Sequence, residues 1–181
     1  MFTLITGGSR SGKSTFAEQK AEEKGKDVIY IATAGVKDEE MRERVKMHLQ
    51  RRPEQWLTIE EELELEKTLQ EIGNKGDAVV LIDCLTLWLA NMMSEYWACI
   101  EREGFTAFLS TMDNKMRSLV RKIKELPHDV ILVSNEVGWG IVPESKSGRF
   151  FQDLSGKMSQ IAAREADRVY LMVAGLPLKV K

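Results

Sequence analysis

The sequence predicts an α/β fold in which helices cover both faces of a mostly parallel central sheet. Short apolar runs alternate with longer amphipathic stretches along the chain, a pattern typical of repeated strand and helix units. The apolar runs are nearly continuous, as expected of strands that are covered on both faces. A chain of 181 residues without a Pro-rich linker suits one domain, so we expect a single domain over residues 1–181.

The expected elements follow from these runs in chain order. Strands are expected where the apolar runs stand, at residues 2–6, 27–33, 77–83, 129–135 and 168–175. Helices are expected over the amphipathic stretches, at residues 13–24, 38–50, 60–72, 85–98, 105–125 and 149–166. The acidic run EEELELEKTLQE, which begins the helix over 60–72, is interpreted as a solvated helix face.

Composition and charge exclude several classes of protein. The 26 basic and 28 acidic residues leave a net charge of -2, so no basic excess indicates nucleic-acid binding. Cys84 and Cys99 are too few for a disulfide framework and lack zinc-ligand spacing, which favours a reducing compartment. The first residues, MFTLITGG, are too short for a signal peptide, and no apolar run reaches the length of a membrane span. We therefore expect a soluble, cytoplasmic protein.

The strongest local motif is GGSRSGKS, which matches the phosphate-binding pattern G-x-x-x-x-G-K-[ST] between a strand and a helix. In such a loop, backbone N–H groups and the helix N-terminus can converge on anionic oxygens. Lys13 would bridge the β- and γ-phosphates, and the Ser14 hydroxyl would bind Mg²⁺. The expected nucleotide-binding residues are Gly7, Gly8, Ser9, Arg10, Ser11, Gly12, Lys13 and Ser14.

A second metal ligand is expected at Asp83, which ends the apolar run VVLID. A carboxylate at this position suits the Walker-B role, and the alternative is that Asp83 caps the next helix.

Two short sequences resemble guanine-switch motifs but stand in the wrong order. NKGD at residues 74–77 is interpreted as a turn, and DLSG at residues 153–156 as part of a helix.

His48 stands in KMHLQRRP, just before two arginines and a proline. Nearby arginines favour the neutral, nucleophilic imidazole and can contact phosphate. From the local sequence alone, a nucleophile and an exposed histidine on a charged helix both remain open. His128, between a helix and a strand, has no such neighbours.

Seven motifs in this order resemble one family over essentially the whole chain. They are ITGGSRSGKS, YIAT, HLQRRPEQW, LIDCLTLWLAN, SNEVGWGIVPE, GRFFQDLSG and VAGLPLKVK. The resemblance is to the bifunctional adenosylcobinamide kinase/adenosylcobinamide-phosphate guanylyltransferase family of cobalamin biosynthesis. It implies a RecA-type P-loop fold with a three-layer sandwich, a homotrimer, and Mg²⁺ with GTP and ATP as substrates. It also implies phosphorylation of adenosylcobinamide, followed by transfer of GMP from GTP to the resulting phosphate.

The resemblance implies roles for residues of this chain. His48 falls on the histidine that carries GMP, so His48 and Lys13 are the expected catalytic residues. The segment Ile31, Ala32 and Thr33 would line the nucleotide pocket, and Gln50, Arg51, Arg52, Glu60 and Asp83 would approach the nucleotide.

Some features remain undecided by the sequence. Glu136 is a candidate pocket residue or part of a strand-end turn. The stretch LTLWLANMMSEYW is a candidate corrinoid pocket or, as we favour, a buried helix face. Two other functions stay open: a monofunctional small-molecule kinase of the P-loop class, in which His48 is a surface residue, and a nucleotide-dependent regulatory ATPase module.

Overall fold

A seven-stranded sheet forms the centre of the molecule. The computed structural model describes residues 1–35, 39, 42–43, 53–73 and 76–181. The strands lie in the order β3-β2-β4-β5-β1-β6-β7, and every neighbouring pair is parallel except β6 and β7. Their bounds are β1 Phe2–Gly7, β2 Asp27–Ala32, β3 Leu57–Glu60, β4 Ala78–Asp83, β5 Asp129–Val133, β6 Arg168–Val173 and β7 Leu176–Lys179.

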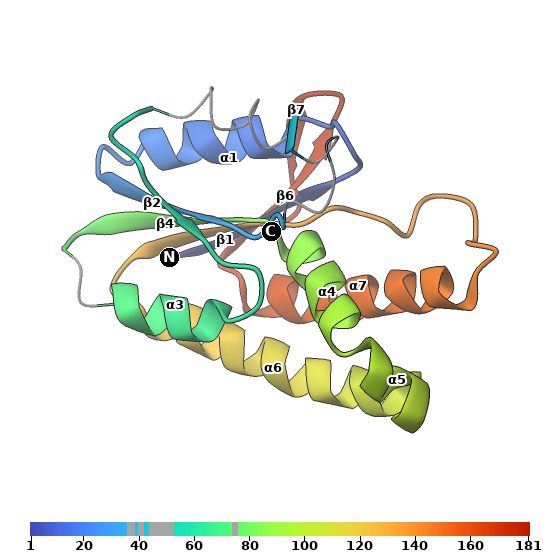
Figure 1. Cartoon of the computed structure of the whole chain (residues 1–181). Helices are drawn as coiled ribbons and strands as arrows, with labels where there is room; N and C mark the ends of the chain where they lie inside the picture. The colour runs from blue at the N-terminus through green and yellow to red at the C-terminus, as the bar shows by residue number, and fades with distance from the viewer. Residues whose placement is uncertain (36–38, 40–41, 44–52, 74–75) are drawn as a thin grey trace.

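Helices cover both faces of this sheet, so the described part of the chain forms three layers (Figure 1). Helix α1 packs over β1, β4 and β5 on one face, and the other described helices lie on the opposite face. Their bounds are α1 Lys13–Glu22, α3 Leu65–Ile72, α4 Leu85–Glu95, α5 Trp97–Glu103, α6 Phe105–Glu125 and α7 Lys146–Glu165. The predicted mostly parallel α/β sheet is confirmed.

The core is divided by the sheet into two apolar clusters, because successive strand side chains point to opposite faces. On β4, Val79 and Leu81 pack beneath α1, whereas Val80 and Ile82 pack against the helices of the other layer. All four side chains are fully buried. Burial on both faces explains why this strand is apolar at every position from Ala78 to Ile82, rather than at alternate ones.

All five predicted strands are present, but two edge strands were not predicted. Strand β3 is only half-buried and every residue of β7 is exposed. Edge strands of this kind need no continuous apolar run, so they leave no strong pattern in the sequence.

The predicted helices need several corrections. The helix expected over 60–72 begins only at Leu65, because the preceding residues complete β3 and a turn. The acidic run is not simply solvated, since its Leu65 and Leu69 are fully buried. The helix expected over 85–98 is two helices, α4 and α5, and the last begins at Lys146 rather than 149. Residues 153–156 lie inside α7, as predicted. The helix expected over 38–50 and the start of NKGD, residues 74 and 75, fall almost wholly outside the described residues.

Candidate nucleotide-binding site

The phosphate-binding motif forms a tight loop between β1 and α1. Gly12, the residue before the helix, has a φ of +93°, which side chains of other residues rarely tolerate. A Cβ atom on Gly7 would lie 2.6 Å from the carbonyl oxygen of Met172. The loop therefore needs glycine at both ends, one for backbone conformation and one for close packing against β6. Among its other members, Ser9 and Arg10 are exposed, whereas Gly8, Ser11 and Ser14 are half-buried.

Lys13 lies at the start of α1 and is 6% exposed. Its Nζ atom donates a hydrogen bond to the carbonyl oxygen of Gly8 at 2.6 Å, which holds the ammonium group against the loop. Burial lowers the pKa of Lys13, and coulombic interactions with Cys84 and Asp83 oppose that shift. Asp83 therefore acts electrostatically on Lys13, although the two residues are 70 positions apart in the chain.

Strand register explains how Asp83 comes beside the loop. Asp83 of β4 and Ile5 of β1 both lie level with Val133 of β5, which separates the two strands. Because the parallel strands run in one direction, the carboxylate at the end of β4 and the phosphate-binding loop after β1 lie together at the carboxyl ends of the strands. Tyr30 of β2 donates its hydroxyl hydrogen to Asp83 Oδ2 at 2.8 Å. The alternative role as a helix cap is not observed, because the residue at the N-cap of α4 is Cys84.

The end of β2 is fastened to the end of β4 by Thr33. The fully buried Thr33 hydroxyl donates to the Cys84 carbonyl and accepts from the Cys84 N–H, both at 2.7 Å. Asn91 of α4 in turn donates to the Thr33 carbonyl at 2.8 Å. The resemblance assigned Thr33 to the nucleotide pocket; in the structure its side chain forms this brace, which positions the backbone beside Asp83. Asn91 was missed, because a single buried amide in an apolar helix gives no local signal.

Other predicted site residues lie near the same carboxyl ends of the strands. Ile31 is fully buried in β2, whereas Ala32 is half-buried and lies level with both Asp83 and Glu60 in the neighbouring strands. The Glu60 side chain is exposed. The structure therefore brings Ala32, Glu60 and Asp83 together at the ends of three adjacent strands.

Glu136 follows β5 and lies beside the start of the loop. Its N–H donates to the carbonyl oxygen of Gly7 at 2.8 Å, and its carboxylate accepts from the N–H of Gly138 at 2.9 Å. The side chain thus closes a strand-end turn, while its backbone joins β5 to the phosphate-binding loop.

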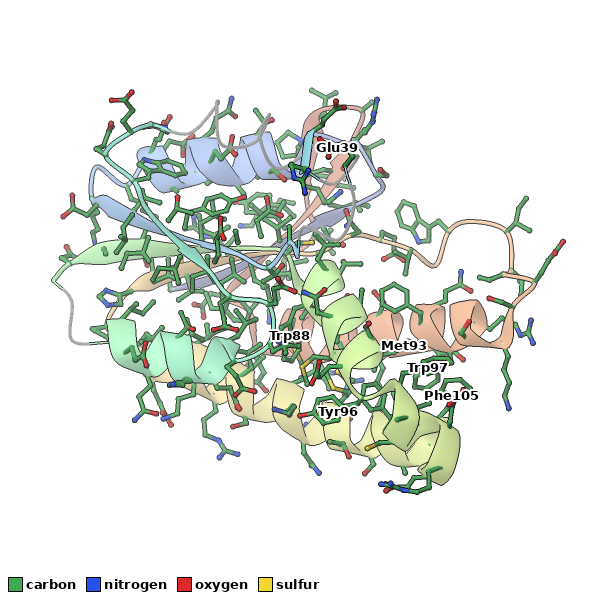
Figure 2. All side chains as sticks on the ribbon, in the orientation of Figure 1. Glu39, Trp88, Met93, Tyr96, Trp97 and Phe105 are labelled. Atoms are coloured by element: carbon green, nitrogen blue, oxygen red, sulfur yellow. The ribbon has the colours of Figure 1, made fainter. Side chains whose placement is uncertain are left out.

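The stretch LTLWLANMMSEYW is mostly a buried helix face, which is the interpretation favoured from the sequence. Trp88 and Met92 are buried in the core, and the Trp88 indole N–H donates to the Leu63 carbonyl at 2.9 Å. Figure 2 shows Tyr96 and Trp97 farther along, at the far end of the helical layer near Phe105. The Trp97 and Phe105 rings meet edge to face at 6.2 Å between centroids.

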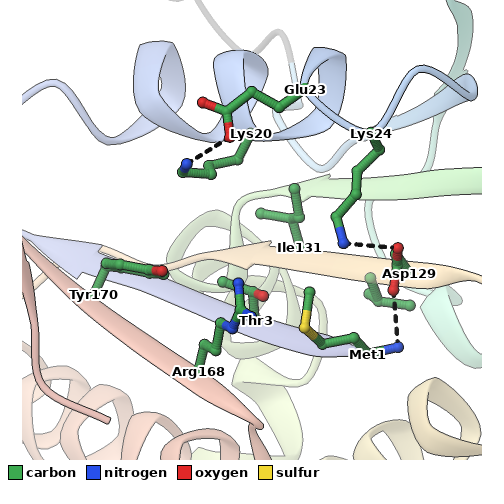
Figure 3. A pocket seen from close by; sticks show the side chains of 10 residues that line it. Met1, Thr3, Lys20, Glu23, Lys24, Asp129, Ile131, Arg168 and Tyr170 are labelled. Carbon is green, nitrogen blue, oxygen red and sulfur yellow. Dashed lines mark hydrogen bonds and ion pairs between the residues drawn. The ribbon is translucent and has the colours of Figure 1, made fainter.

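A small pocket lies between α1 and the first residues of β1, β5 and β6 (Figure 3). Asp129 there pairs with the amino group of Met1 at 3.0 Å and with Lys24 at 2.9 Å. These ion pairs lower the pKa of Asp129, even though partial burial opposes the shift. The pocket has a volume of about 70 Å³, far below the size of a site for a nucleotide.

Comparison with known proteins places the chain in a family. The model of the cobinamide kinase/cobinamide phosphate guanyltransferase family matches residues 3–180. The chain belongs to this family. It is 37% identical, over the full length of both chains, to the bifunctional adenosylcobalamin biosynthesis protein CobU of Escherichia coli. It is 42% identical to the bifunctional adenosylcobalamin biosynthesis protein CobP of Pseudomonas aeruginosa, over all of this chain and 98% of that one.

Solved structures with little sequence similarity share the fold. An ATPase from the type III secretion system of pathogenic bacteria matches with a TM-score of 0.61 and 14% identity, over 94% of this chain and 50% of that one. A protein from Pyrococcus horikoshii OT3 matches with a TM-score of 0.59 and 6% identity, over 99% of this chain and 85% of that one. At these identities the likeness concerns the fold alone.

Several residues that the resemblance assigned lie outside the described part of the structure. They are His48, Gln50, Arg51 and Arg52. The second histidine of this cobinamide kinase/guanyltransferase family member, His128, is buried, and its Nε2 donates to the Ile72 carbonyl at 3.2 Å. His128 is therefore a buried, hydrogen-bonded residue that joins α3 to the start of β5.

The described residues contain no group of three or more His, Cys, Asp or Glu side chains arranged to hold a metal ion. A nucleotide-bound Mg²⁺ does not need such a group, because it takes one or two protein oxygens and completes its shell with phosphates and water. The Ser14 hydroxyl and the Asp83 carboxylate are oxygen donors of this kind.

Within the described residues, no helix combines the length and the apolar character needed to cross a membrane.

Proposed function

We propose that this chain carries out both reactions of its family on one nucleotide site. It transfers a phosphoryl group from ATP or GTP to the hydroxyl of adenosylcobinamide, and GMP from GTP to adenosylcobinamide phosphate, which yields adenosylcobinamide-GDP. The observation that carries the proposal is that strand register places Asp83 at the same end of the sheet as the phosphate-binding loop, where its charge acts on Lys13. This arrangement occurs in a chain that matches the family over residues 3–180.

Lys13 and the loop N–H groups would bind the triphosphate and offset the charge that develops on its oxygens. In the kinase step the substrate hydroxyl attacks the γ-phosphorus, and a new O–P bond replaces the bond to the departing nucleoside diphosphate. That reaction depends mainly on positioning and charge stabilisation. Ala32 and Glu60, at the ends of neighbouring strands, would line the nucleotide side of this site, with Ile31 buried beneath them.

In the guanylyl-transfer half, the neutral imidazole of His48 would attack the α-phosphorus of GTP. A P–N bond forms as the bond to pyrophosphate breaks, and the phosphate of the corrinoid then displaces the histidine by forming a P–O bond. Gln50, Arg51 and Arg52 would contact the nucleotide, with the arginines offering bidentate contacts to phosphate.

Ser14 and Asp83 are the proposed protein ligands of Mg²⁺. Bound there, the ion would neutralise part of the phosphate charge. Tyr30 and the Thr33 brace would hold the Asp83 carboxylate in place through the hydrogen bond to its Oδ2 atom and the bonds to Cys84.

Labelling with α-³²P GTP tests the proposal. The wild-type protein should gain a label that is labile in acid and stable in base, and His48→Ala should gain none. His128→Asn is the matched control and should be labelled normally, because His128 is buried against Ile72. Chase with adenosylcobinamide phosphate should release the label as adenosylcobinamide-GDP. Phosphorylation of adenosylcobinamide without any protein label would instead indicate a monofunctional kinase.

The proposal includes a homotrimer located in the cytoplasm. An apolar surface that suits assembly lies between β5 and α7, where Trp139, Ile141 and Val142 are 70%, 95% and 68% exposed. Arg149 holds this segment by donating to the carbonyls of Pro143 and Glu144. Sedimentation should show a trimer for the wild type and a smaller, still folded species for Ile141→Glu. A wild type that stays monomeric at every concentration would contradict this part of the proposal.

A further inference from the structure

An open pocket of about 340 Å³ lies between the first turns of α1 and the β6–β7 hairpin. It shares Gly12 with the phosphate-binding loop, so it begins where the phosphate-binding turn ends. Its volume is in the range of small-ligand sites. Its lining residues are Gly12, Thr15, Phe16, Gln19, Gly175 and Pro177.

We propose that this pocket holds the purine base of the nucleotide whose phosphates bind the loop, and that the Gln19 side chain reads the edge of the base. The inference rests on the proposed function, because only a nucleotide anchored at the loop brings a base to this place. It assigns a recognition role to a residue outside the phosphate-binding motif.

The distances along α1 suit a nucleotide. At about 1.5 Å of rise per residue, Gln19 lies about 10 Å along the helix axis from Gly12, a separation comparable to the span from phosphate to base. Thr15 and Gln19 stand four residues apart, so they lie on the same face of the helix. Both side chains are exposed and both line the pocket.

The walls of the pocket offer apolar surfaces for a planar ring. Phe16 on α1 is half-buried and packs edge to face against Tyr170, with 5.3 Å between ring centroids. The Lys20 ammonium group lies 5.4 Å from the Phe16 centroid, which further restricts the ring. Pro177 comes from the other side, on β7. A base entering between these surfaces would bury apolar area on both of its faces.

The hairpin is fastened to the loop that binds the phosphates. The Gly175 N–H donates to the Ser11 carbonyl at 3.0 Å, and a Cβ atom on Gly12 would lie 3.3 Å from Gly175 Cα. Gly175 itself has a φ of +83° in the hairpin turn. The wall that carries Pro177 is therefore positioned by the same loop that binds the triphosphate.

The chemistry of Gln19 indicates which bases it accepts. A glutamine amide offers one acceptor and two donor hydrogens, and it can rotate to exchange them. In one orientation it pairs with the amino group and a ring nitrogen of adenine, and in the other with the carbonyl and ring N–H of guanine. The pocket is thus expected to accept both purines alike and to bind pyrimidines more weakly, because their shorter rings leave the amide out of reach.

Calorimetry with ATP, GTP, UTP and inorganic tripolyphosphate tests the inference. Gln19→Ala should weaken ATP and GTP binding alike by about tenfold, equivalent to one or two lost hydrogen bonds, and should leave tripolyphosphate binding unchanged. Pro177→Gly should act in the same sense. Gln70→Ala, an exposed glutamine on α3, is the matched control and should change nothing.

The outcomes separate this inference from the proposed function. Unchanged ATP and GTP affinity in Gln19→Ala would overturn the base pocket while nucleotide binding stands. Equal weakening of tripolyphosphate would assign the effect to a disturbed phosphate loop and would also overturn the pocket. A wild type that binds neither tripolyphosphate nor any nucleotide would overturn the proposed function, and the base pocket with it.

Discussion

At the residue scale, Lys13 combines burial with a functional charge. Its ammonium group is held by the Gly8 carbonyl and lies in the field of Asp83. Burial without a full ion pair disfavours the charged form, which is the cause of its lowered pKa. A bound triphosphate would supply the missing negative charge and raise that pKa again.

The shifted pKa of Lys13 predicts how nucleotide affinity changes with pH. Because the pKa lies below 10.5, the side chain loses its proton at lower pH than an ordinary lysine, and GTP affinity should fall over the alkaline range below that value. Calorimetry across this range measures the fall, and Lys13→Ala should lose both binding and the two transfer reactions. A wild-type affinity that stays constant up to pH 10.5 would contradict the prediction.

Cys84 is a buried thiol beside the site. Burial raises its pKa from 9.0 to about 12, and the negative field of Asp83 acts in the same direction. The thiol should therefore resist alkylation in the folded protein, whereas the half-buried Cys99 should react first. Mass spectrometry after brief treatment with iodoacetamide checks the order. Faster modification of Cys84 than of Cys99 would show that the thiol is not held in its protonated, buried form.

The same shift predicts a loss of stability in alkali. Above about pH 9 the unfolded chain releases the Cys84 proton, but the folded protein keeps it up to about pH 12. The unfolded state thus binds fewer protons, so the free energy of unfolding falls as pH rises through this window. Urea denaturation should show the wild type losing stability relative to Cys84→Ala between these two pH values. If the free energy of unfolding changed with pH equally in the two proteins, the Cys84 thiol would make no contribution to the loss of stability.

At the element scale, the brace between β2 and β4 decides where Asp83 stands. Thr33→Val keeps the shape of the side chain but leaves the buried N–H and carbonyl of Cys84 without their partner. We expect a loss of about 2 kcal/mol in the free energy of unfolding, the usual cost of orphaned buried polar groups. Thermal or urea denaturation measures it, with Thr58→Val on the half-buried edge strand β3 as the matched control. A loss no larger than that of the control would show that the brace contributes nothing.

The edge elements show why some of the fold escaped prediction. Strands β1, β4 and β5 lie inside the sheet, and their continuous apolar runs gave the correct positions. Strand β7 exposes every residue, including Leu176 and Leu178, so its formation depends on pairing with β6 rather than on burial. The boundary between α4 and α5 likewise depends on packing, since the helical pattern continues across Tyr96.

At the scale of the whole molecule, both apolar clusters share the strands of one sheet. Disruption of either cluster exposes the same strands, so the chain should unfold as one cooperative unit, in keeping with the single domain expected over residues 1–181. Far-ultraviolet circular dichroism should report the helices, and tryptophan fluorescence should report Trp88 and Trp56, which are buried in different clusters. Coincident transitions are expected, and two separated midpoints would contradict a single domain.

The amino-acid sequence by itself determined the phosphate-binding loop, the five inner strands and membership of the cobinamide kinase/guanyltransferase family. These features are local, because glycine spacing and apolar runs act within a few residues of each other. The sequence also predicted Asp83 as a metal ligand at this loop, but only the tertiary structure decided which strand register brings it there, that Thr33 braces β4, and that the β6–β7 hairpin walls a pocket beside α1. Each of these depends on strand order and register, which join residues far apart in the chain and leave no trace in local periodicity.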